Sequence, residues 1–343
     1  MINNFLFNFS SSYKDGGLKR VMAYVQWFNS HGGAYFIVNI RMQKLLCGYE
    51  NNHYYYINSE KTEKALNRQN YLKKILNQLP FQPDLYYSYG IPIHSKIGKI
   101  NWYHLSNVLP LISHSEYGLP LLRSIELKWL GYLTRKGYKN TDVLSAESNY
   151  SLSLLPSNSK FSHVLSPNGS DEEIKLFSQS IEYKVNNIAV IVGTVFYKDL
   201  DSSYNIFLRL QTKNSKLRLV VVGNDAMVPD KIKNDQRVDM MGELKHSEVV
   251  SLLSSARFYI NTSKVENSWN AISEGIFLAT ESYVSDIPPH IELIKIIQAD
   301  NYELNNGLIH IKKSNIAIDN LDLWSDIIKD MIKALTIGDN VYK

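Results

Sequence analysis

Alternation between apolar strand-like runs and helical runs in the second half of the sequence is the feature that most limits the possible fold. The predicted strands are 188–192, 217–222, 238–241, 258–262 and 282–285. The predicted helices are 202–210, 247–255 and one that begins near Ser268. Strands that alternate with helices form a doubly wound parallel sheet. Gly193, Gly223 and Gly242 each follow a strand, where sheets of this kind bind ligands.

The first half of the sequence shows the same alternation less regularly. Strand-like runs at 4–9 and 34–39 enclose a helical run at 18–29, which predicts a right-handed β-α-β unit. Further strands are predicted at 85–89, 100–104 and 141–146, and 60–78 has helical character. The α/β class is therefore expected throughout the chain.

The length of 343 residues exceeds what one ordinary core holds, so two domains are expected. The run 156–171 has low hydrophobicity and contains prolines and a glycine, which marks it as the preferred junction. The predicted domains are 1–165 and 166–343. The last helix of the chain is a candidate to pack back on the first domain.

Charge is divided unevenly between the two predicted domains. Residues 1–165 hold 18 Lys and Arg against 9 Asp and Glu, whereas the remainder holds 19 against 24. A basic first half favours an anionic partner, either a phosphate-bearing substrate or an anionic membrane surface. A solvated face without a partner explains the same charge equally well. The basic residues lack the interleaved aromatic groups that stack on bases, so nucleic acid is not an expected partner.

Several features favour a cytoplasmic protein. No apolar run approaches 18 residues, so no membrane span is predicted. The N-terminus lacks the basic start and cleavage site of a signal peptide. Cys47 is the single cysteine, which excludes an internal disulfide, and no Cys/His cluster has zinc spacing. The segment 119–139 mixes leucines, a tryptophan and basic residues, and it is either an ordinary surface helix or a helix that lies on an anionic membrane.

The stretch 258–275, FYINTSKVENSWNAISEG, is the candidate ligand site of the second half. Its strand leads into a helix whose first N–H groups have no intrahelical partner and carry the positive end of the helix dipole, which suits a diphosphate. Glu274 lies inside this helix at about the distance from a diphosphate to ribose hydroxyls, and Glu266 lies in the preceding loop. Lys198, in the loop that begins at Gly193, is placed to meet the diphosphate.

The loop DGGLKR is a second candidate site, in the first half. Gly16 and Gly17 permit close approach of backbone N–H groups to an oxygen-rich ligand. Lys19 and Arg20 add positive charge at the start of the same helix. This loop is therefore the predicted phosphate or acceptor loop.

Residues 188–292 resemble the C-terminal domain of GT-B, family 4 retaining glycosyltransferases. The likeness runs through GTVFYK at 193–198, VVVGND at 220–225 and the Glu-x7-Glu motif ENSWNAISE at 266–274. Over residues 1–165 it is looser and consists of DGGLKR and HLSNVLP. The resemblance implies GT-B architecture, with two Rossmann-like doubly wound domains that face each other across a cleft.

The resemblance also implies roles for residues of the second half. Glu266 contacts the transferred sugar, and Glu274 binds the ribose. Base recognition falls near Gly242 and Glu243. Thr194 stands where the family carries an arginine, which predicts weaker neutralisation of the diphosphate. Main-chain contacts with the donor are implied for Trp269, Asn270 and Ala271.

A histidine of the first half meets the donor sugar in the family. His104, at the end of a predicted strand, is the candidate for this contact, and Asn107 is the alternative. His104 therefore joins Glu266 and Lys198 as a predicted catalytic residue. Taken without the resemblance, each of these two polar residues is an ordinary satisfied structural group.

The implied activity is retaining transfer of a hexose or N-acetylhexosamine, such as GalNAc, Gal or Glc, from a UDP-sugar. The implied acceptor is a lipid-diphosphate-linked saccharide in the synthesis of bacterial O-antigen, the polysaccharide of lipopolysaccharide, or capsule. The leaving diphosphate takes the acceptor proton, so no metal or other cofactor is implied. The expected location is the cytoplasm, peripherally on the inner face of the cytoplasmic membrane.

Three alternatives remain open. The first is a transferase that uses a GDP-sugar. The second is a nucleotide-sugar epimerase or an inverting enzyme of the same fold. The third, suggested by the basic first half, is a non-enzymatic binder of anionic ligands.

Overall fold

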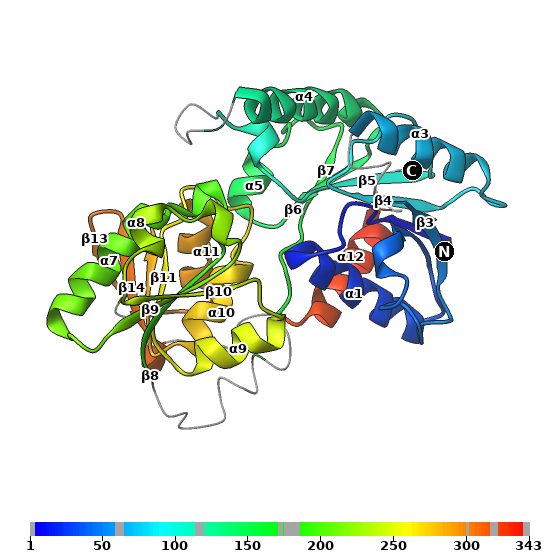
Figure 1. Cartoon of the computed structure of the whole chain (residues 1–343). Helices are drawn as coiled ribbons and strands as arrows, with labels where there is room; N and C mark the ends of the chain where they lie inside the picture. The colour runs from blue at the N-terminus through cyan, green and yellow to red at the C-terminus, as the bar shows by residue number, and fades with distance from the viewer. Residues whose placement is uncertain are drawn as a thin grey trace. The chain divides into compact units, whose positions relative to one another are not determined.

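The computed structural model describes residues 4–58, 65–113, 119, 121–170, 174, 186–299, 302–315 and 322–338. The chain divides into two compact units (Figure 1). The first unit comprises 1–113, 120–168 and 324–343, and the second comprises 114–119 and 169–323. Over the described ranges, each unit is organised around a seven-stranded sheet. None of the helices in these ranges is long and apolar enough to cross a membrane.

The first unit is built on a parallel sheet with the strand order β3-β2-β1-β4-β5-β6-β7. Its strands are β1 (Phe5–Asn8), β2 (Tyr35–Asn39), β3 (His53–Ile57), β4 (Leu85–Tyr89), β5 (Ile100–Leu105), β6 (Val143–Ala146) and β7 (Ser162–Leu165). Its α-helices are α1 (Asp15–Ser30), α3 (Ala65–Asn77), α4 (Leu121–Gly137), α5 (Asn149–Ser153) and α12 (Trp324–Gly338). Short 3-10 helices are η1 (Ile40–Met42), η2 (Leu109–Leu111) and η3 (Tyr138–Asn140).

Helices cover both faces of this sheet. α1 and α12 lie side by side on one face, and α3 and α4 lie on the other (Figure 1). Phe7, Phe36 and Tyr87 of the central strands are fully buried in the core that α1 covers. Met331 of α12 joins this core, and its sulfur accepts a hydrogen bond from the hydroxyl of Tyr24 at 3.3 Å. α12 therefore completes the first unit although it follows the second unit in sequence.

Two strands of the first sheet lie where the sequence predicts none. β7 falls inside 156–171, the predicted junction, and pairs in parallel with β6. Because β7 is an edge strand whose residues alternate between half-buried and exposed, it has no apolar run to reveal it. β3 consists of His, three Tyr and Ile, and it pairs in parallel with β2. The first unit continues to Asn168, so the boundary falls inside 156–171 but after the predicted domain end at 165.

The second unit has the strand order β10-β9-β8-β11-β12-β14-β13. Its strands are β8 (Asn186–Val192), β9 (Arg218–Val222), β10 (Val238–Gly242), β11 (Ala256–Asn261), β12 (Glu281–Ser285), β13 (Glu303–Asn305) and β14 (Leu308–Lys312). Its α-helices are α7 (Leu200–Lys213), α8 (Asp230–Lys233), α9 (His246–Ser254), α10 (Asn270–Leu278) and α11 (Pro288–Ile296). Short 3-10 helices are η4 (Phe196–Lys198), η5 (Asp225–Met227) and η6 (Lys313–Asn315).

Successive side chains of the parallel strands β8 to β12 point to opposite faces of the sheet, and helices cover both faces, as the apolar runs predict. Ile191 and Val221 belong to the core with α7, whereas Val190, Val220 and Tyr259 belong to the core with α9, α10 and α11. β14 runs antiparallel to both β12 and β13, which the sequence does not predict. The predicted α/β class, with a Rossmann-like sheet in each half, is confirmed.

Candidate active site

The loops that follow β8 and β11 bring Lys198 and Glu266 together. Parallel strands end at one edge of a sheet, so residues far apart in sequence meet there. Lys198 Nζ lies 2.6 Å from Glu266 Oε1, and the two side chains are 9% and 16% exposed. Both side chains have lost most of their water, and their mutual attraction at this distance offsets part of that desolvation cost. The structure thus joins two of the predicted catalytic residues in one site.

A series of hydrogen bonds from β11 holds the carboxylate of Glu266. The hydroxyl of Ser263 donates to Glu266 Oε1 at 2.8 Å, and the N–H of Ser263 donates to Asn261 Oδ1 at 3.0 Å. Asn261 donates to the hydroxyl of Tyr259 at 2.9 Å. Because the series begins inside a strand, Glu266 is fixed relative to the sheet. No motif selects Ser263 or Asn261, although polar residues directly after an apolar strand are the signal that could find them.

His290 of α11 is a buried group near this pair that the sequence does not single out. Its Nδ1 donates to the carbonyl oxygen of Ser285 at 2.8 Å, and the hydroxyl of Ser285 donates to the carbonyl oxygen of Ser263 at 2.6 Å. Burial lowers the pKa of His290 to about 4, although Glu266 acts in the opposite direction. His290 is therefore neutral near pH 7, and it ties α11 to the loop that carries Glu266.

Two glycines let the loops after β8 and β9 approach each other. Gly193 has φ of +87° and Gly223 has φ of +142°, both in the region that favours glycine. A Cβ at Gly223 would lie 2.8 Å from Thr194 Oγ1, which donates to the carbonyl oxygen of Asn224 at 3.0 Å. Thr194 is buried and links the two loops. It supplies no charge where the resembled family has an arginine.

α10 begins at Asn270, later than the expected start near Ser268. Its N-cap residue, Trp269, makes no side-chain cap hydrogen bond and is buried in the core, so only its main chain can meet a ligand. The first N–H groups of the helix, which include those of Asn270 and Ala271, have no intrahelical partner. A Cβ at Gly275 would lie 2.1 Å from the ring of Tyr259, so glycine allows α10 to pack closely on β11.

Glu274 lies inside α10 with its side chain 13% exposed. Its Oε1 is 3.1 Å from Nε2 of His246, the first residue of α9. β10 ends at Gly242, which has φ of +64°, and Glu243 is exposed in the loop that follows. The predicted ribose contact, on α10, therefore lies beside the first residue of α9, and the loop with the predicted base contact directly precedes α9. The sequence does not indicate His246, because no motif relates a residue of α9 to a residue of α10.

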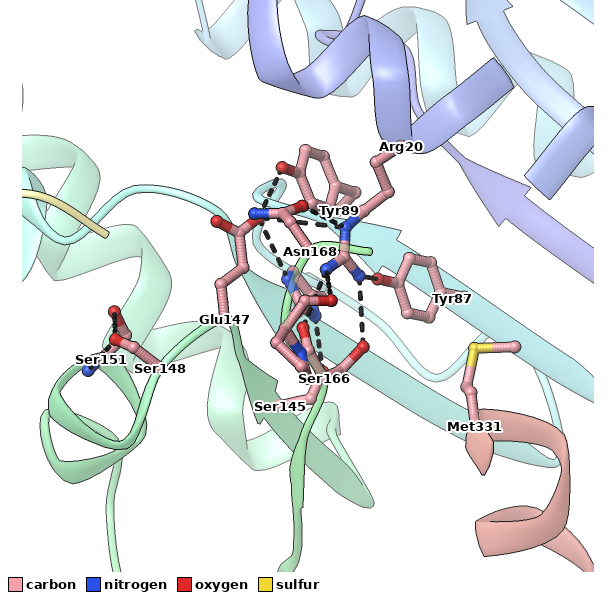
Figure 2. Close-up of polar contacts among 12 residues, drawn as sticks. Arg20, Tyr87, Tyr89, Ser145, Glu147, Ser148, Ser151, Ser166, Asn168 and Met331 are labelled. Atoms are coloured by element: carbon pink, nitrogen blue, oxygen red, sulfur yellow. Dashed lines mark hydrogen bonds and ion pairs between the residues drawn. The ribbon is translucent and has the colours of Figure 1, made fainter. Parts of the chain in front are cut away.

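In the first unit, Arg20 is fully buried rather than exposed at the start of α1 (Figure 2). Its guanidinium donates to the carbonyl oxygens of Ser166 and Pro167, at 2.8 Å each. It also donates to Asn168 Oδ1 and to the hydroxyl of Tyr87, at 3.3 Å each. Arg20 thus fastens the segment 166–168 to α1. This structural role replaces the phosphate contact that the loop DGGLKR predicts for it.

The other predicted residues of that loop lie at the start of α1. Gly16 and Gly17 fall in the first turn, which begins after Lys14 without a side-chain cap hydrogen bond. A Cβ at Gly17 would lie 3.2 Å from Ser12 Cβ, so a larger residue would crowd the turn. Lys19 is half-buried one turn further along. The N-terminal N–H groups of α1 remain suited to an anion.

His104 is also fully buried, on β5. In register it lies opposite Tyr89 of β4 and Ser145 of β6, and its Nδ1 is 2.8 Å from Ser145 Oγ. Burial, aided by the charge on Arg20, lowers the pKa of His104 to about 4. A neutral imidazole with no exposed surface does not make the donor-sugar contact predicted for it. The alternative, Asn107, is exposed, and its Oδ1 accepts from the N–H of Leu109 at 3.0 Å.

Glu147, which no motif selects, stands at the end of β6 (Figure 2). Its Oε1 lies 3.6 Å from Nε2 of His104. It accepts from the hydroxyl of Tyr89 at 2.7 Å and lies 3.9 Å from Arg20 Nε. Burial raises the pKa of Glu147, but His104 and Arg20 outweigh burial, and the pKa is lowered. Glu147 is therefore an ionised, buried carboxylate whose charge Arg20 balances. A carboxylate directly after a predicted strand is the signal that could have found it.

No group of three His, Cys, Asp or Glu side chains in the described ranges is arranged to hold a metal ion.

By sequence, no protein-family model and no curated protein matches the chain.

Comparison with solved structures finds the same architecture in proteins of known fold. Sucrose-phosphate synthase from Thermosynechococcus elongatus has a TM-score of 0.63 and 11% identity, and covers 99% of this chain and 100% of its own. WaaG, a glycosyltransferase involved in lipopolysaccharide biosynthesis, has a TM-score of 0.60 and 13% identity, with coverages of 87% and 85%. Anabaena HepE in complex with UDP and glucose has a TM-score of 0.59 and 12% identity, with coverages of 98% and 100%.

The chain has the GT-B fold. The likeness extends over nearly all of both chains for two of these three structures, so it includes both units. At these identities it establishes the fold alone. The GT-B fold predicted from the glycine loops and the Glu-x7-Glu motif is thereby confirmed.

Proposed function

We propose that this GT-B protein is a retaining glycosyltransferase that takes a hexose or N-acetylhexosamine from a UDP-sugar. The observation that carries the proposal is the Lys198–Glu266 pair in the loops beside α10, the helix that also carries Glu274. Structures of similar fold include one in complex with UDP and glucose and a glycosyltransferase of lipopolysaccharide biosynthesis. They support a nucleotide-sugar donor for this chain.

The proposed chemistry assigns each group to a part of the donor. The N–H groups at the start of α10 and the ammonium of Lys198 stabilise the diphosphate as it leaves with growing negative charge. Glu266 accepts hydroxyl groups of the transferred sugar. The departing diphosphate takes the proton of the acceptor on the same face, so the donor configuration is retained. This scheme requires neither a dedicated base nor a metal.

The proposed acceptor is a saccharide joined through diphosphate to a lipid, as in the synthesis of bacterial O-antigen or capsule. The excess of basic residues in 1–165 supports an anionic acceptor. The start of α1, with Gly16, Gly17 and Lys19, is the proposed phosphate site of the first unit. The proposed location is therefore at the membrane that holds the lipid-linked acceptor, on its cytoplasmic face.

α4 is the proposed contact with that membrane. One side of α4 packs on the unit so closely that a Cβ at Gly131 would lie 2.0 Å from the carbonyl oxygen of Pro110. The other side exposes five large apolar side chains, which are 48–77% exposed: Leu121, Leu122, Ile125, Trp129 and Tyr132. Exposed cations accompany them at Lys128, Arg135 and Lys136. An apolar row flanked by cations is typical of a helix that lies on an anionic bilayer.

The purified protein is expected to sediment with vesicles that contain anionic lipid at low salt, and less at high salt because salt screens the cations. Replacing both Ile125 and Trp129 by serine should weaken binding roughly tenfold or more, since two apolar side chains no longer leave water. Leu45→Ser is the matched control, because Leu45 is 51% exposed in the same unit but outside α4. Failure of the wild-type protein to sediment with anionic vesicles at low salt would refute the membrane proposal.

A thermal-shift panel of nucleotide sugars tests the proposed donor. The true donor is expected to stabilise the protein, and a ligand at a hundred times its Kd adds about 2.7 kcal/mol to the free energy of unfolding.

UDP-sugars should stabilise the protein in this panel. Transfer should persist in EDTA, and NMR of the product should show the anomeric configuration of the donor. Stabilisation by GDP-sugars alone would change the donor, and an inverted product would remove the retaining mechanism. Indifference to every nucleotide sugar would overturn the proposal.

A further inference from the structure

His246 contacts the proposed ribose-binding carboxylate from outside the Glu-x7-Glu motif. Its Nε2 lies 3.1 Å from Glu274 Oε1, within hydrogen-bonding distance. The imidazole is 37% exposed and the carboxylate side chain 13% exposed. The contact therefore forms at the border of the core, where it is partly shielded from water.

The backbones that carry both side chains are fixed. His246 opens α9, and the N–H of the preceding residue, Lys245, donates to Glu248 Oε2 at 2.7 Å, which closes the first turn. α10 packs against α9, and Gly275 seats α10 on the ring of Tyr259. The imidazole and the carboxylate thus meet through two helices that have little freedom to move apart.

This contact restricts how the carboxylate can turn. A glutamate carboxylate rotates broadly about its last torsion angle unless a neighbour holds it. A donor on Oε1 sets the plane of the group, and the vicinal hydroxyls of a ribose are a bidentate partner for a carboxylate whose plane is set. Orientation before binding reduces the entropy lost when the ligand arrives.

We propose that His246 is a positioning residue for the nucleoside half of the donor, and that it orients Glu274 toward the ribose hydroxyls. The assignment rests on the proposed function, which makes Glu274 the ribose contact. His246 also directly follows the loop 243–245, which leads from Gly242 at the end of β10 and carries the proposed base contact. The same residue therefore joins the base loop to the ribose contact.

Calorimetric titration with UDP and with 2′,3′-dideoxy-UDP, which lacks both ribose hydroxyls, tests this role. His246→Ala is expected to weaken UDP binding about tenfold, the effect of one hydrogen bond to a charged group. The affinity for the dideoxy nucleotide should stay unchanged, because this nucleotide has no ribose hydroxyl that could donate a hydrogen bond to Glu274. His246→Gln, whose amide can still donate, should recover most of the loss.

His310→Ala is the matched control. His310 belongs to the same unit and makes a similar contact with a glutamate, 2.8 Å from Glu281 Oε2, but it lies on β14. Its removal should leave both affinities unchanged. Equal weakening of UDP and dideoxy-UDP by His246→Ala would show that His246 acts through the fold, and it would overturn the proposal, as would an unchanged affinity for UDP.

Glu274→Ala separates this proposal from the proposed function. If Glu274→Ala weakens UDP binding and His246→Ala does not, only the role of His246 is refuted. If Glu274→Ala binds UDP as tightly as the wild type, the ribose assignment itself fails, and the role of His246 fails with it. A wild-type protein that binds no nucleotide overturns both.

Discussion

Replacement of Glu266 by glutamine is expected to lower the turnover number by about a thousandfold, the upper range for one group that stabilises a transition state. The amide cannot accept the hydroxyls of the transferred sugar as a carboxylate does, and it no longer balances the charge on Lys198, 2.6 Å away. UDP affinity should persist or increase, because Lys198 loses the carboxylate that competes with the diphosphate. Single-turnover kinetics and calorimetry with UDP measure the two effects separately.

Two further variants serve as comparisons for the loss of turnover in Glu266→Gln. Ser263→Ala removes the hydroxyl 2.8 Å from Glu266 Oε1 but leaves the charge, and it should lower turnover roughly tenfold. Glu303→Gln removes a carboxylate that is 71% exposed in the same unit, and it should change nothing. Unchanged turnover of Glu266→Gln with the true donor would exclude Glu266 from catalysis. A loss of both turnover and UDP affinity would instead indicate a damaged fold.

Replacement of Arg20 by methionine is expected to lower the free energy of unfolding by about 3–5 kcal/mol, the range for removing one partner of a buried ion pair. The methionine would leave Glu147 charged and buried, and the carbonyl oxygens of Ser166 and Pro167 would lose their donors. Urea denaturation at pH 7 measures the loss. Arg20→Lys keeps the positive charge but lacks the planar guanidinium that donates to several acceptors. Its free energy of unfolding should therefore lie between those of the wild type and Arg20→Met.

The double variant Arg20→Met, Glu147→Gln tests the cause of that loss. Since it removes the charge left behind, part of the stability should return, and the two changes should not add. Arg41→Met is the control, because Arg41 is exposed and lies over the ring of Tyr13, so its loss should cost about 0.5 kcal/mol or less. A loss below about 1 kcal/mol for Arg20→Met would contradict the structural role of Arg20.

Most of the fold is predictable from the sequence because its strands are buried on both faces. The runs that become β8, β9 and β11 are mainly apolar, and helices separate them, so their type and order follow from hydropathy. β7 and β13 escape this reasoning because edge strands expose much of their surface. For such strands, pairing with a neighbour decides the structure, and pairing is a property of the whole sheet.

The candidate site was predictable where function follows from position along a strand. Lys198 and Glu266 lie between a strand end and the next helix, Glu274 lies inside the helix that follows, and the edge of a parallel sheet collects such residues. Strand ends do not reveal which way a side chain points. His104 sits near the end of β5, but its register with Ser145 turns it into the core under α1. Arg20 is turned inward likewise, and its partners at 166–168 are far away in sequence.

α12 has a consequence for the order in which the protein is made. The first unit needs Ile328, Met331 and Leu335 of α12 to complete its core, yet these residues are translated after the whole second unit. The second unit, by contrast, is complete once residue 323 has been added. On the ribosome, the unit that begins the chain is therefore the last to close, and its aromatic core, covered by α1, lacks its second helix on that face until then.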